Sequence, residues 1–345
     1  MSDNLHFEDA LDQSLDCIDR ALATSGVILT RRPLYAAIEF VDTFVIEVIT
    51  SGKVATKPGA LEEYVNSEWF KVVYARTVAW YSGRYGEAMK RDNSRLLRGV
   101  VTILGTPFLI NVPVITREPG RPGETIWICY HDRVKESEDS LSWIVAGPNV
   151  ANIPRSDGMK ARREANEVAG TLRASYVNLI SATAPDLQAG QLRDAILPHL
   201  EQAADGIVRS RPEDLKRSQW DVQMACELSL KLLAQQQAGT FEATHDLFVL
   251  FDRIPTEKLP FPRHRLSCVP HWEKMVEWRY GGGSSISLAE AFRSYRTALK
   301  IVAAAASAAD RKYNFSQAKF EIRKAPYLHD DPLMFEPRQT PLDES

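Results

Sequence analysis

One stretch of the sequence holds residues whose types and spacing suit a metal ion. His264, Cys268 and His271 follow one another at intervals of four and three residues. Imidazole nitrogens and thiolates are the ligands that zinc prefers in structural sites, which use four of them. A fourth ligand is not evident nearby, and a loop with one buried cysteine and two polar histidines explains the same residues. We therefore expect neither a metal centre nor a cofactor.

A basic stretch offers a second kind of chemistry, which is contact with phosphate groups. Residues 90–98 read KRDNSRLLR, and on a helix Arg91, Arg95 and Arg98 would share one face. A solvated surface is the commoner origin of such a run. The sequence holds no glycine-rich phosphate loop, nucleophile elbow, HExxH motif or EF-hand loop, so no standard motif fixes a reaction.

The overall composition is that of an ordinary globular protein. The chain has 345 residues, 44% of them apolar and 25% charged, which predicts two or three domains and excludes a disordered chain, a coiled-coil rod and a collagen. The net charge is -3, so no global positive field marks a nucleic-acid-binding protein, although a local patch is compatible with it. The four cysteines are widely spaced, which predicts reduced thiols rather than a disulfide framework.

The sequence favours a cytoplasmic protein without membrane association. The N-terminus, MSDNLHFEDALDQSLD, is acidic and lacks the apolar core of a signal peptide. No window approaches the run of about 18 apolar residues that a transmembrane helix needs. The longest apolar stretch, 100–115, is broken by glycine, proline and polar residues.

Hydrophobic periodicity predicts helices in the first part of the chain. A helix at 7–25 has apolar residues at intervals of three and four, and Gly26 is well placed to end it. The segment 34–50 is apolar nearly all round, which predicts a buried helix. A third helical region, rich in aromatic residues, covers 60–90.

The pattern then changes to one that is typical of β-structure. Residues 99–117 are rich in β-branched residues, and residues 124–131 alternate apolar and polar side chains. The turn signal EPGRPG separates the two segments, so we expect a β-hairpin or a small antiparallel sheet. The segment 141–146, LSWIVA, is expected to add a strand, and GPNVANIPRSDG at 147–158 is the best candidate for a domain boundary.

The rest of the chain is predicted to be mostly helical. The segment 159–182 carries charges of both signs, among them Arg173, which indicates a solvated helix face. Further helices are expected at 187–208, 212–237 and 287–310. Ser287 and Glu290 fit a capping box at the start of the last one. We thus expect an α+β fold that is mainly α, with an α+β domain at 1–155, a helical domain at 156–310 and an acidic, proline-containing tail at 325–345 that is disordered or loosely docked.

Two short motifs in the helical region belong together. Ala225–Lys231 reads ACELSLK, and Thr244–Leu247 reads THDL at the start of the next predicted helix. Arg279-Tyr280 stands ahead of the final long helix. These motifs resemble those of the HEPN domain, a small α-helical bundle found in bacterial, archaeal and some eukaryotic proteins. The resemblance covers about residues 187–310 and implies a HEPN-like helical bundle there.

The same residues also have a purely structural interpretation. Glu227 and Lys231 lie four residues apart, in the order that favours an ion pair on a helix surface. Thr244 is a good N-cap, and Asp246 falls in the first turn, where the helix dipole favours an anion. His245 is then a packing or hydrogen-bonding residue at the helix start rather than a catalyst.

The resemblance also implies a nucleolytic alternative. Many HEPN proteins are metal-independent ribonucleases whose motif is an arginine followed four to six residues later by a histidine, paired across a dimer. Histidine can shuttle the proton of the 2'-hydroxyl, and arginine can stabilise the charged transition state. The pairs with this spacing are Arg193/His199, Arg265/His271 and Arg323/His329, and chance alone produces such pairs in a chain of this composition. Arg265/His271 has the chain order of the family, but Leu266 replaces a polar residue and Pro270 interrupts a helix between the two.

Binding without catalysis is the function that the resemblance favours. We expect a HEPN-like accessory or effector protein that binds RNA or a nucleotide or mediates homodimerisation. The expected binding residues are Glu227, Lys231, His245 and Arg279. Two alternatives stay open. One is a ribonuclease that uses Arg265 and His271 at a dimer interface, and the other is a purely structural interaction protein.

Overall fold

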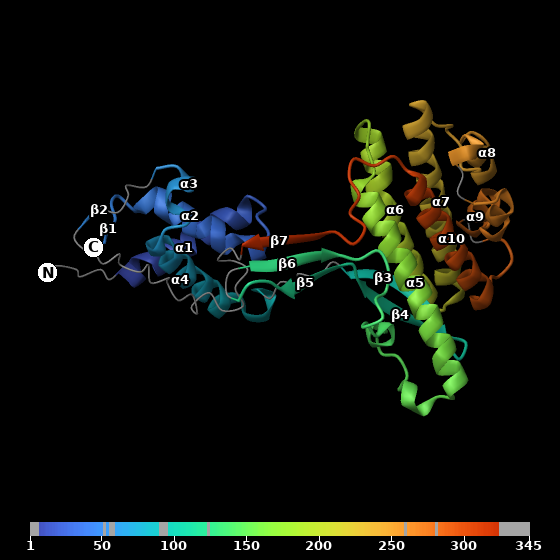
Figure 1. The fold of residues 1–345 in the computed structure, drawn as a ribbon, viewed down its shortest axis with the longest axis horizontal. Coiled ribbons are helices and arrows are strands. Elements are labelled where there is room, and N and C mark those ends of the chain that lie inside the picture. Colours follow the sequence, from blue (N-terminus) through green and yellow to red (C-terminus); the bar gives the residue numbers. More distant parts are fainter. Residues whose placement is uncertain are drawn as a thin grey trace. The chain divides into compact units, whose positions relative to one another are not determined.

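The computed structural model describes residues 7–50, 53–54, 59–89, 96–122, 125–258, 261–279 and 282–323 (Figure 1). These residues are mainly helical with small antiparallel sheets, which confirms the expected fold class. They divide into two compact units. The N-terminal unit comprises the described residues up to Asn93, with Arg121–Ile126 and those from Ile322 on, and the C-terminal unit comprises Ser94–Gly120 and Trp127–Glu321. The expected tail at 325–345 lies outside the described residues.

Helices build the N-terminal unit. They are α1 (Phe7–Thr24), α2 (Arg32–Phe44), α3 (Leu61–Tyr64) and α4 (Glu68–Tyr85), with 3-10 turns η1 (Leu29–Arg31) and η2 (Gly86–Met89) and the short strands β1 (Ile49–Thr50) and β2 (Lys53–Val54). Leu11, Leu15 and Ile18 are buried on one face of α1, as their spacing predicts. Gly26 follows α1 at a φ of 73°, a left-handed conformation that glycine adopts without strain.

Helix α2 is shorter and more exposed than the sequence predicts. The helix expected at 34–50 ends at Phe44, because Val45 is extended and the β-branched residues after it favour that conformation. Phe44 and Ile46 are 52% and 82% exposed, so the prediction of a helix buried all round is wrong. One face of α2 is buried, through Pro33, Ala36, Ala37, Phe40 and Val41.

The C-terminal unit begins with a β-hairpin. Strands β3 (Leu96–Ile103) and β4 (Thr106–Pro113) are antiparallel, with Gly99 opposite Ile110. The turn is Leu104-Gly105, where both residues have the positive φ that a two-residue hairpin turn requires. The predicted β-structure is therefore present. The turn of this hairpin, however, lies at Leu104-Gly105 and not at the EPGRPG signal that the sequence suggests. That signal joins β5 (Ile115–Pro119) to β6 (Thr125–Tyr130), and the strand order of this sheet is β5-β6-β7, with β7 at Lys319–Arg323.

The strand predicted at 141–146 is wrong. Ser140–Trp143 forms a 3-10 turn, η3. The carboxylate of Asp139 accepts a hydrogen bond from the backbone N–H of Leu141 at 3.2 Å. A short side chain that captures a nearby backbone donor in this way favours a tight turn over a strand. Ile144 alone makes a β-bridge, to strand β4.

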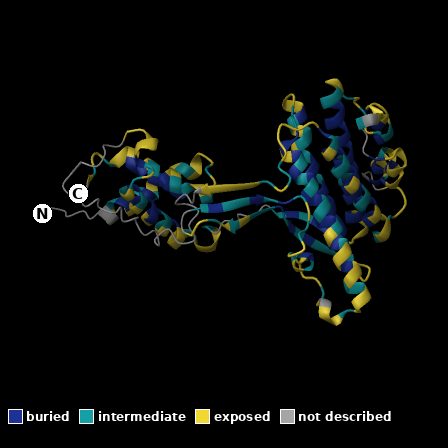
Figure 2. Cartoon of the chain, viewed as in Figure 1, coloured by how far each residue is buried: buried dark blue, intermediate teal, exposed yellow. Residues whose placement is uncertain are grey.

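Long helices form the body of the C-terminal unit, and α5 (Arg155–Ser181), α6 (Leu187–Arg209), α7 (Pro212–Ala238) and α10 (Leu288–Ala308) confirm the helices predicted there (Figure 1). Their buried residues face inward and their exposed residues lie on the outer faces (Figure 2). Ser287 and Glu290 form the predicted capping box of α10. Between α7 and α10 along the chain lie α8 (Leu247–Asp252), η5 (Thr256–Lys258), η6 (Arg263–Cys268) and α9 (Trp272–Arg279). Within the described part of the chain, no helix is long and apolar enough to span a membrane.

The β3–β4 hairpin packs closely against helix α5 at Gly99. A Cβ atom at this position would lie 2.9 Å from side-chain carbons of Val168 and Leu172, so only glycine allows this approach. Buried residues of β3, β4, α5 and α6 belong to one apolar core. Because the hairpin shares this core, the boundary that the sequence places at 147–158 lies inside the C-terminal unit.

Candidate functional site

Glu227 and Lys231 form a buried ion pair in the middle of α7. Lys231 Nζ donates a hydrogen bond to Glu227 Oε1 at 2.7 Å, and the two side chains are 11% and 2% exposed. The sequence predicts the pair correctly, but its placement on the surface is wrong. Helix α7 packs against α6, α8, α9 and α10, which together leave little of its surface to solvent. The ring of Phe241 lies 5.3 Å from Lys231 Nζ and helps to cover it.

His245 lies at the outer edge of this ion pair. Its Nδ1 is 3.1 Å from Oε2 and 3.2 Å from Oε1 of Glu227, while the His245 side chain is 59% exposed. Its backbone carbonyl accepts a hydrogen bond from Gln223 Nε2 at 2.8 Å. Both the ring and the backbone of His245 are thus held by α7. A carboxylate at Nδ1 fixes the orientation of an imidazole ring. The other nitrogen, Nε2, is then free to exchange a proton or to contact a ligand.

Asp246 starts helix α8. Its Oδ1 accepts hydrogen bonds from the backbone N–H groups of Phe248 at 2.8 Å and Val249 at 3.4 Å, which makes Asp246 the N-cap. The prediction that Thr244 is the cap is therefore wrong. Thr244 instead accepts a hydrogen bond from the backbone N–H of Asp246 at 3.1 Å through its Oγ1. This contact supports the turn that presents His245.

His271 joins the same group through Asp246. Its Nε2 is 3.6 Å from Asp246 Oδ2, its Nδ1 is 3.6 Å from Glu273 Oε2, and its side chain is 42% exposed. His245 and Asp246 are neighbours in the chain, and their side chains contact Glu227 and His271 respectively. We call Glu227, Lys231, His245, Asp246 and His271 the polar cluster.

The other predicted members are not brought into the polar cluster. Arg265 lies exposed on η6, which ends at Cys268, so no continuous helix connects it to His271. Arg279 ends helix α9, but its side chain lies outside the described residues. Gln223 also contacts His245, but the two residues are 22 positions apart, so no local pattern in the sequence indicates this contact.

The remaining sequence candidates have other surroundings. His199 Nδ1 lies 2.8 Å from Asp221 Oδ1, and Arg193 is hydrogen-bonded to Asp194. The side chain of Arg323 and all of His329 lie outside the described residues. Cys268 is exposed rather than buried. Among the described residues, no group of three or more His, Cys, Asp or Glu side chains is placed to hold a metal ion.

The alternative in which residues 90–98 form a helix that meets phosphate groups is wrong where the structure describes this stretch. Arg98 lies in strand β3, since the chain is already extended from Leu96 on. Its guanidinium donates to Asp205 Oδ2 at 2.6 Å and lies 3.9 Å from Glu201. These carboxylates of α6 compensate its charge, so Arg98 packs the hairpin onto the helix rather than presenting a free cation.

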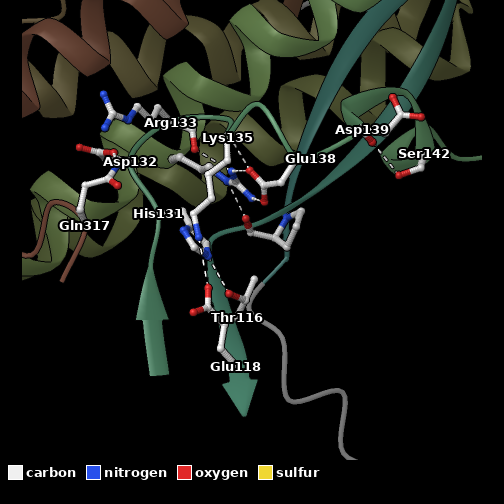
Figure 3. Close-up of polar contacts among 12 residues, drawn as sticks. Thr116, Glu118, His131, Asp132, Arg133, Lys135, Glu138, Asp139, Ser142 and Gln317 are labelled. Carbon is white, nitrogen blue, oxygen red and sulfur yellow. Dashed lines mark hydrogen bonds and ion pairs between the residues drawn. The ribbon is translucent and has the colours of Figure 1, made fainter. Parts of the chain in front are cut away.

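A second polar network surrounds Arg173, which the sequence places on a solvated helix face. That prediction is wrong, because the Arg173 side chain is fully buried. Its guanidinium donates to both carboxylate oxygens of Glu138, at 2.6 and 2.8 Å, and to the backbone carbonyls of Pro113 and Arg133, both at 2.7 Å. The ring of Trp143 covers it at 4.7 Å. The network fixes the loop at 131–142. Figure 3 shows the polar contacts of this loop.

Titratable groups of this loop respond to the same network. Burial alone would raise the pKa of Glu138, but hydrogen bonds from Arg173 and from the backbone N–H of Lys135 outweigh it and lower that pKa. Hydrogen bonds from Lys319 and Lys135 lower the pKa of Glu118 to about 2. Glu118 of β5 pairs with Lys135 of the loop and with Lys319 of β7, so we assign these interactions a structural role.

Acidification is expected to destabilise the C-terminal unit through His131. This ring is buried against Thr116, with Nε2 2.6 Å from its Oγ1. Burial lowers the pKa of His131, and the charges of Lys135 and Arg173 lower it further. The unfolded chain therefore takes up a proton at a higher pH than the folded protein. The stability that His131 contributes is present above the ordinary histidine pKa of about 6.5 and is lost as the pH falls below it.

Urea unfolding at pH values between about 7 and 5 measures this loss. The variant His131→Gln should lose less stability over that range than the parent protein. His264→Gln, which removes an exposed histidine, should match the parent. An unchanged pH dependence in His131→Gln would contradict the role assigned to this ring.

Comparison with protein families, with curated proteins and with solved structures found no match to this chain. The resemblance to HEPN domains therefore rests on the ACELSLK and THDL motifs themselves. In the structure these two motifs supply Glu227, Lys231 and His245, which lie in contact, and Asp246, whose carboxylate lies near His271.

Proposed function

We propose that the C-terminal unit binds RNA or a nucleotide at the polar cluster, and that the protein is a cytoplasmic HEPN-like accessory or effector protein without catalytic activity. The observation that carries this proposal is the contact between the buried carboxylate of Glu227 and the exposed imidazole of His245. The carboxylate holds one ring nitrogen and leaves the other side of the ring to solvent. Such a ring is oriented in advance for a polar ligand.

The energetic cost of the polar cluster supports a functional role. Lysine and glutamate are rarely buried, and a buried ion pair adds little net stability compared with apolar residues of similar size. Buried charged groups with a specific partner are more common at functional sites than elsewhere. The two partly exposed imidazoles can donate hydrogen bonds to phosphate oxygens. The ring of Phe241 beside Lys231 is of the kind on which a base stacks.

A metal-independent ribonuclease is the second candidate. The observation that favours it is the pairing of His245 with Glu227, since a carboxylate-bound imidazole can take a proton from a 2'-hydroxyl. His271, whose Nε2 lies 3.6 Å from Asp246 Oδ2, is the candidate for the acid. In the form that the motif spacing implies, Arg265 acts with His271, with the site completed by a second protomer. Homodimerisation is part of both proposals.

Binding is tested by fluorescence anisotropy with labelled single-stranded RNA of about 20 nucleotides and, separately, with labelled ATP. We expect binding to the parent protein and affinities about tenfold lower in His245→Ala, which corresponds to losing an interaction with a charged group. The control is His264→Ala, which removes an exposed histidine outside the polar cluster and should bind as the parent does. If the protein bound neither probe, the binding proposal would be refuted. The purely structural interaction protein would then be the remaining alternative.

The same preparations decide between binding and cleavage. Unlabelled RNA is incubated with the protein in EDTA and in magnesium, while light scattering reports the mass. Cleavage that survives EDTA and disappears in His245→Ala would replace the binding proposal by the ribonuclease. Cleavage lost in Arg265→Ala and His271→Ala but kept in His245→Ala would assign the reaction to the pair with the family spacing.

A further inference from the structure

The N-terminal unit contains a large apolar groove. It has a volume of about 1310 Å³ and is lined by residues of α1, of α2 and the extended segment after it, and of the first turns of α4. Among the lining residues, Phe44 is 52%, Ile46 is 82%, Ile49 is 62% and Val72 is 58% exposed. Soluble proteins seldom gather exposed apolar side chains of this size in one place unless a partner covers them.

The groove is a product of the early end of α2. After Phe44 the chain runs extended, so the residues of the VIEVI segment no longer follow the helical face that packs on the core. Residues that would be buried in a continuous helix instead form one wall of the groove. The opposite wall includes Trp69 and Val72 of α4. The volume exceeds the 300–1,000 Å³ that is usual for a small-molecule site, which favours a larger occupant.

Charge identifies the kind of occupant. Among the described residues, the charged ones that line the groove are Glu47 and Glu68, and no lysine or arginine is among them. Lys71 offsets Glu68, whereas Glu47 is exposed. The sequence from 7 to 50, which forms two of the three walls, has eight acidic residues and three arginines. This acidic excess and the exposed Glu47 make that side of the groove complementary to a basic partner.

We propose that this groove binds an amphipathic helix of another protein, with an apolar face seated on Phe44, Ile46, Ile49 and Val72 and with lysine or arginine residues flanking that face. Apolar side chains spaced along one helical face fill a groove between helices. The basic flank then lies against Glu47 and the acidic surface of α1 and α2. This proposal does not depend on the function proposed for the C-terminal unit.

The test uses the full chain and a fluorescein-labelled peptide of about 18 residues, built from leucine and lysine so that leucine falls on one helical face. Two peptides serve as comparisons. One carries glutamate in place of lysine, and the other has the same leucine and lysine content in an order without helical periodicity. We expect the first peptide to bind about tenfold more tightly than either comparison, because it alone matches both the shape and the charge of the groove.

Variants locate the binding on the protein. Ile46→Lys and Val72→Lys place a charge at exposed positions in the groove, so the fold is retained while affinity for the leucine–lysine peptide falls about tenfold. The matched control is Ile28→Lys, which changes an equally exposed apolar residue of the same unit outside the groove and should leave binding unchanged. Thermal unfolding of each variant verifies that the N-terminal unit is folded.

Three results would overturn the proposal. One is the absence of binding by the leucine–lysine peptide. Another is equal binding of all peptides, or an equal loss in Ile28→Lys, because either would show non-specific adhesion. A self-associated parent protein that becomes a monomer in Ile46→Lys would show that a second copy of the chain fills the groove.

Discussion

Replacing Arg173 with methionine is expected to destabilise the C-terminal unit by about 3–5 kcal/mol, the usual result of removing one partner from a buried ion pair. The change leaves the carboxylate of Glu138 without its bidentate partner and removes hydrogen bonds to the carbonyls of Pro113 and Arg133. Methionine fills much of the space but satisfies none of these acceptors. Urea unfolding followed by far-ultraviolet circular dichroism measures the change.

Arg162→Met provides a matched control on the same helix. Arg162 is half exposed and pairs with Asp139, and such surface pairs contribute less than about 1 kcal/mol. The double variant Arg173→Met/Glu138→Met should recover part of the lost stability, because no unpaired charge is left in the network. If Arg173→Met and Arg162→Met had the same stability, the network around Arg173 would not have the structural role assigned to it.

Replacing Lys231 with methionine is expected to cost about 3 kcal/mol, since Glu227 then loses the partner that compensates its burial. Glu227 then keeps its contact with His245. The His245 ring is largely exposed, so water also competes for this hydrogen bond. The double variant Glu227→Met/Lys231→Met should regain most of the stability, because apolar residues of similar size suit the surroundings of α7. Ligand binding should not be regained, because His245 has lost the carboxylate that orients its ring.

This divergence between stability and binding separates a functional cluster from a structural one. Denaturant unfolding and the RNA anisotropy assay are run on the same preparations. Lys160→Met, which breaks an exposed ion pair with Asp157, is the control and should change neither. A double variant that recovers both stability and full RNA affinity would show that the buried pair serves packing alone.

Local patterns in the sequence predict most of the helices. The spacing of Leu11, Leu15 and Ile18 defines the buried face of α1, and Ser287 with Glu290 marks the start of α10. These signals lie within a few residues of the feature they predict. These two predictions are correct because the interactions that stabilise each helix face or helix start lie within the same short segment.

The errors concern interactions between distant segments. Mixed charges on α5 indicate a solvated face, but Arg173 is buried because a loop from 35 positions earlier supplies Glu138. Strand β7 joins a sheet whose other strands lie far earlier in the chain. No local pattern records these partners.

The candidate site shows the same division. Its chemistry-bearing residues, Glu227, Lys231, His245 and His271, all follow from the motifs and the residue types. Their burial and mutual contact do not, because α7 is enclosed only once the helices around it have packed. Asp246 caps α8 and lies near His271, whereas the helical spacing of the motif assigned it to the first turn of the helix.

The most direct test of the proposed function is a nuclear magnetic resonance titration of the histidine ring signals with single-stranded RNA. Single-histidine variants assign the signals of His245, His271 and the exposed reference His264. We predict that the signals of His245 and His271 shift together as RNA is added and that the signal of His264 does not. RNA binding that leaves both cluster signals unmoved, or no binding at all, would contradict the claim that the polar cluster is the binding site.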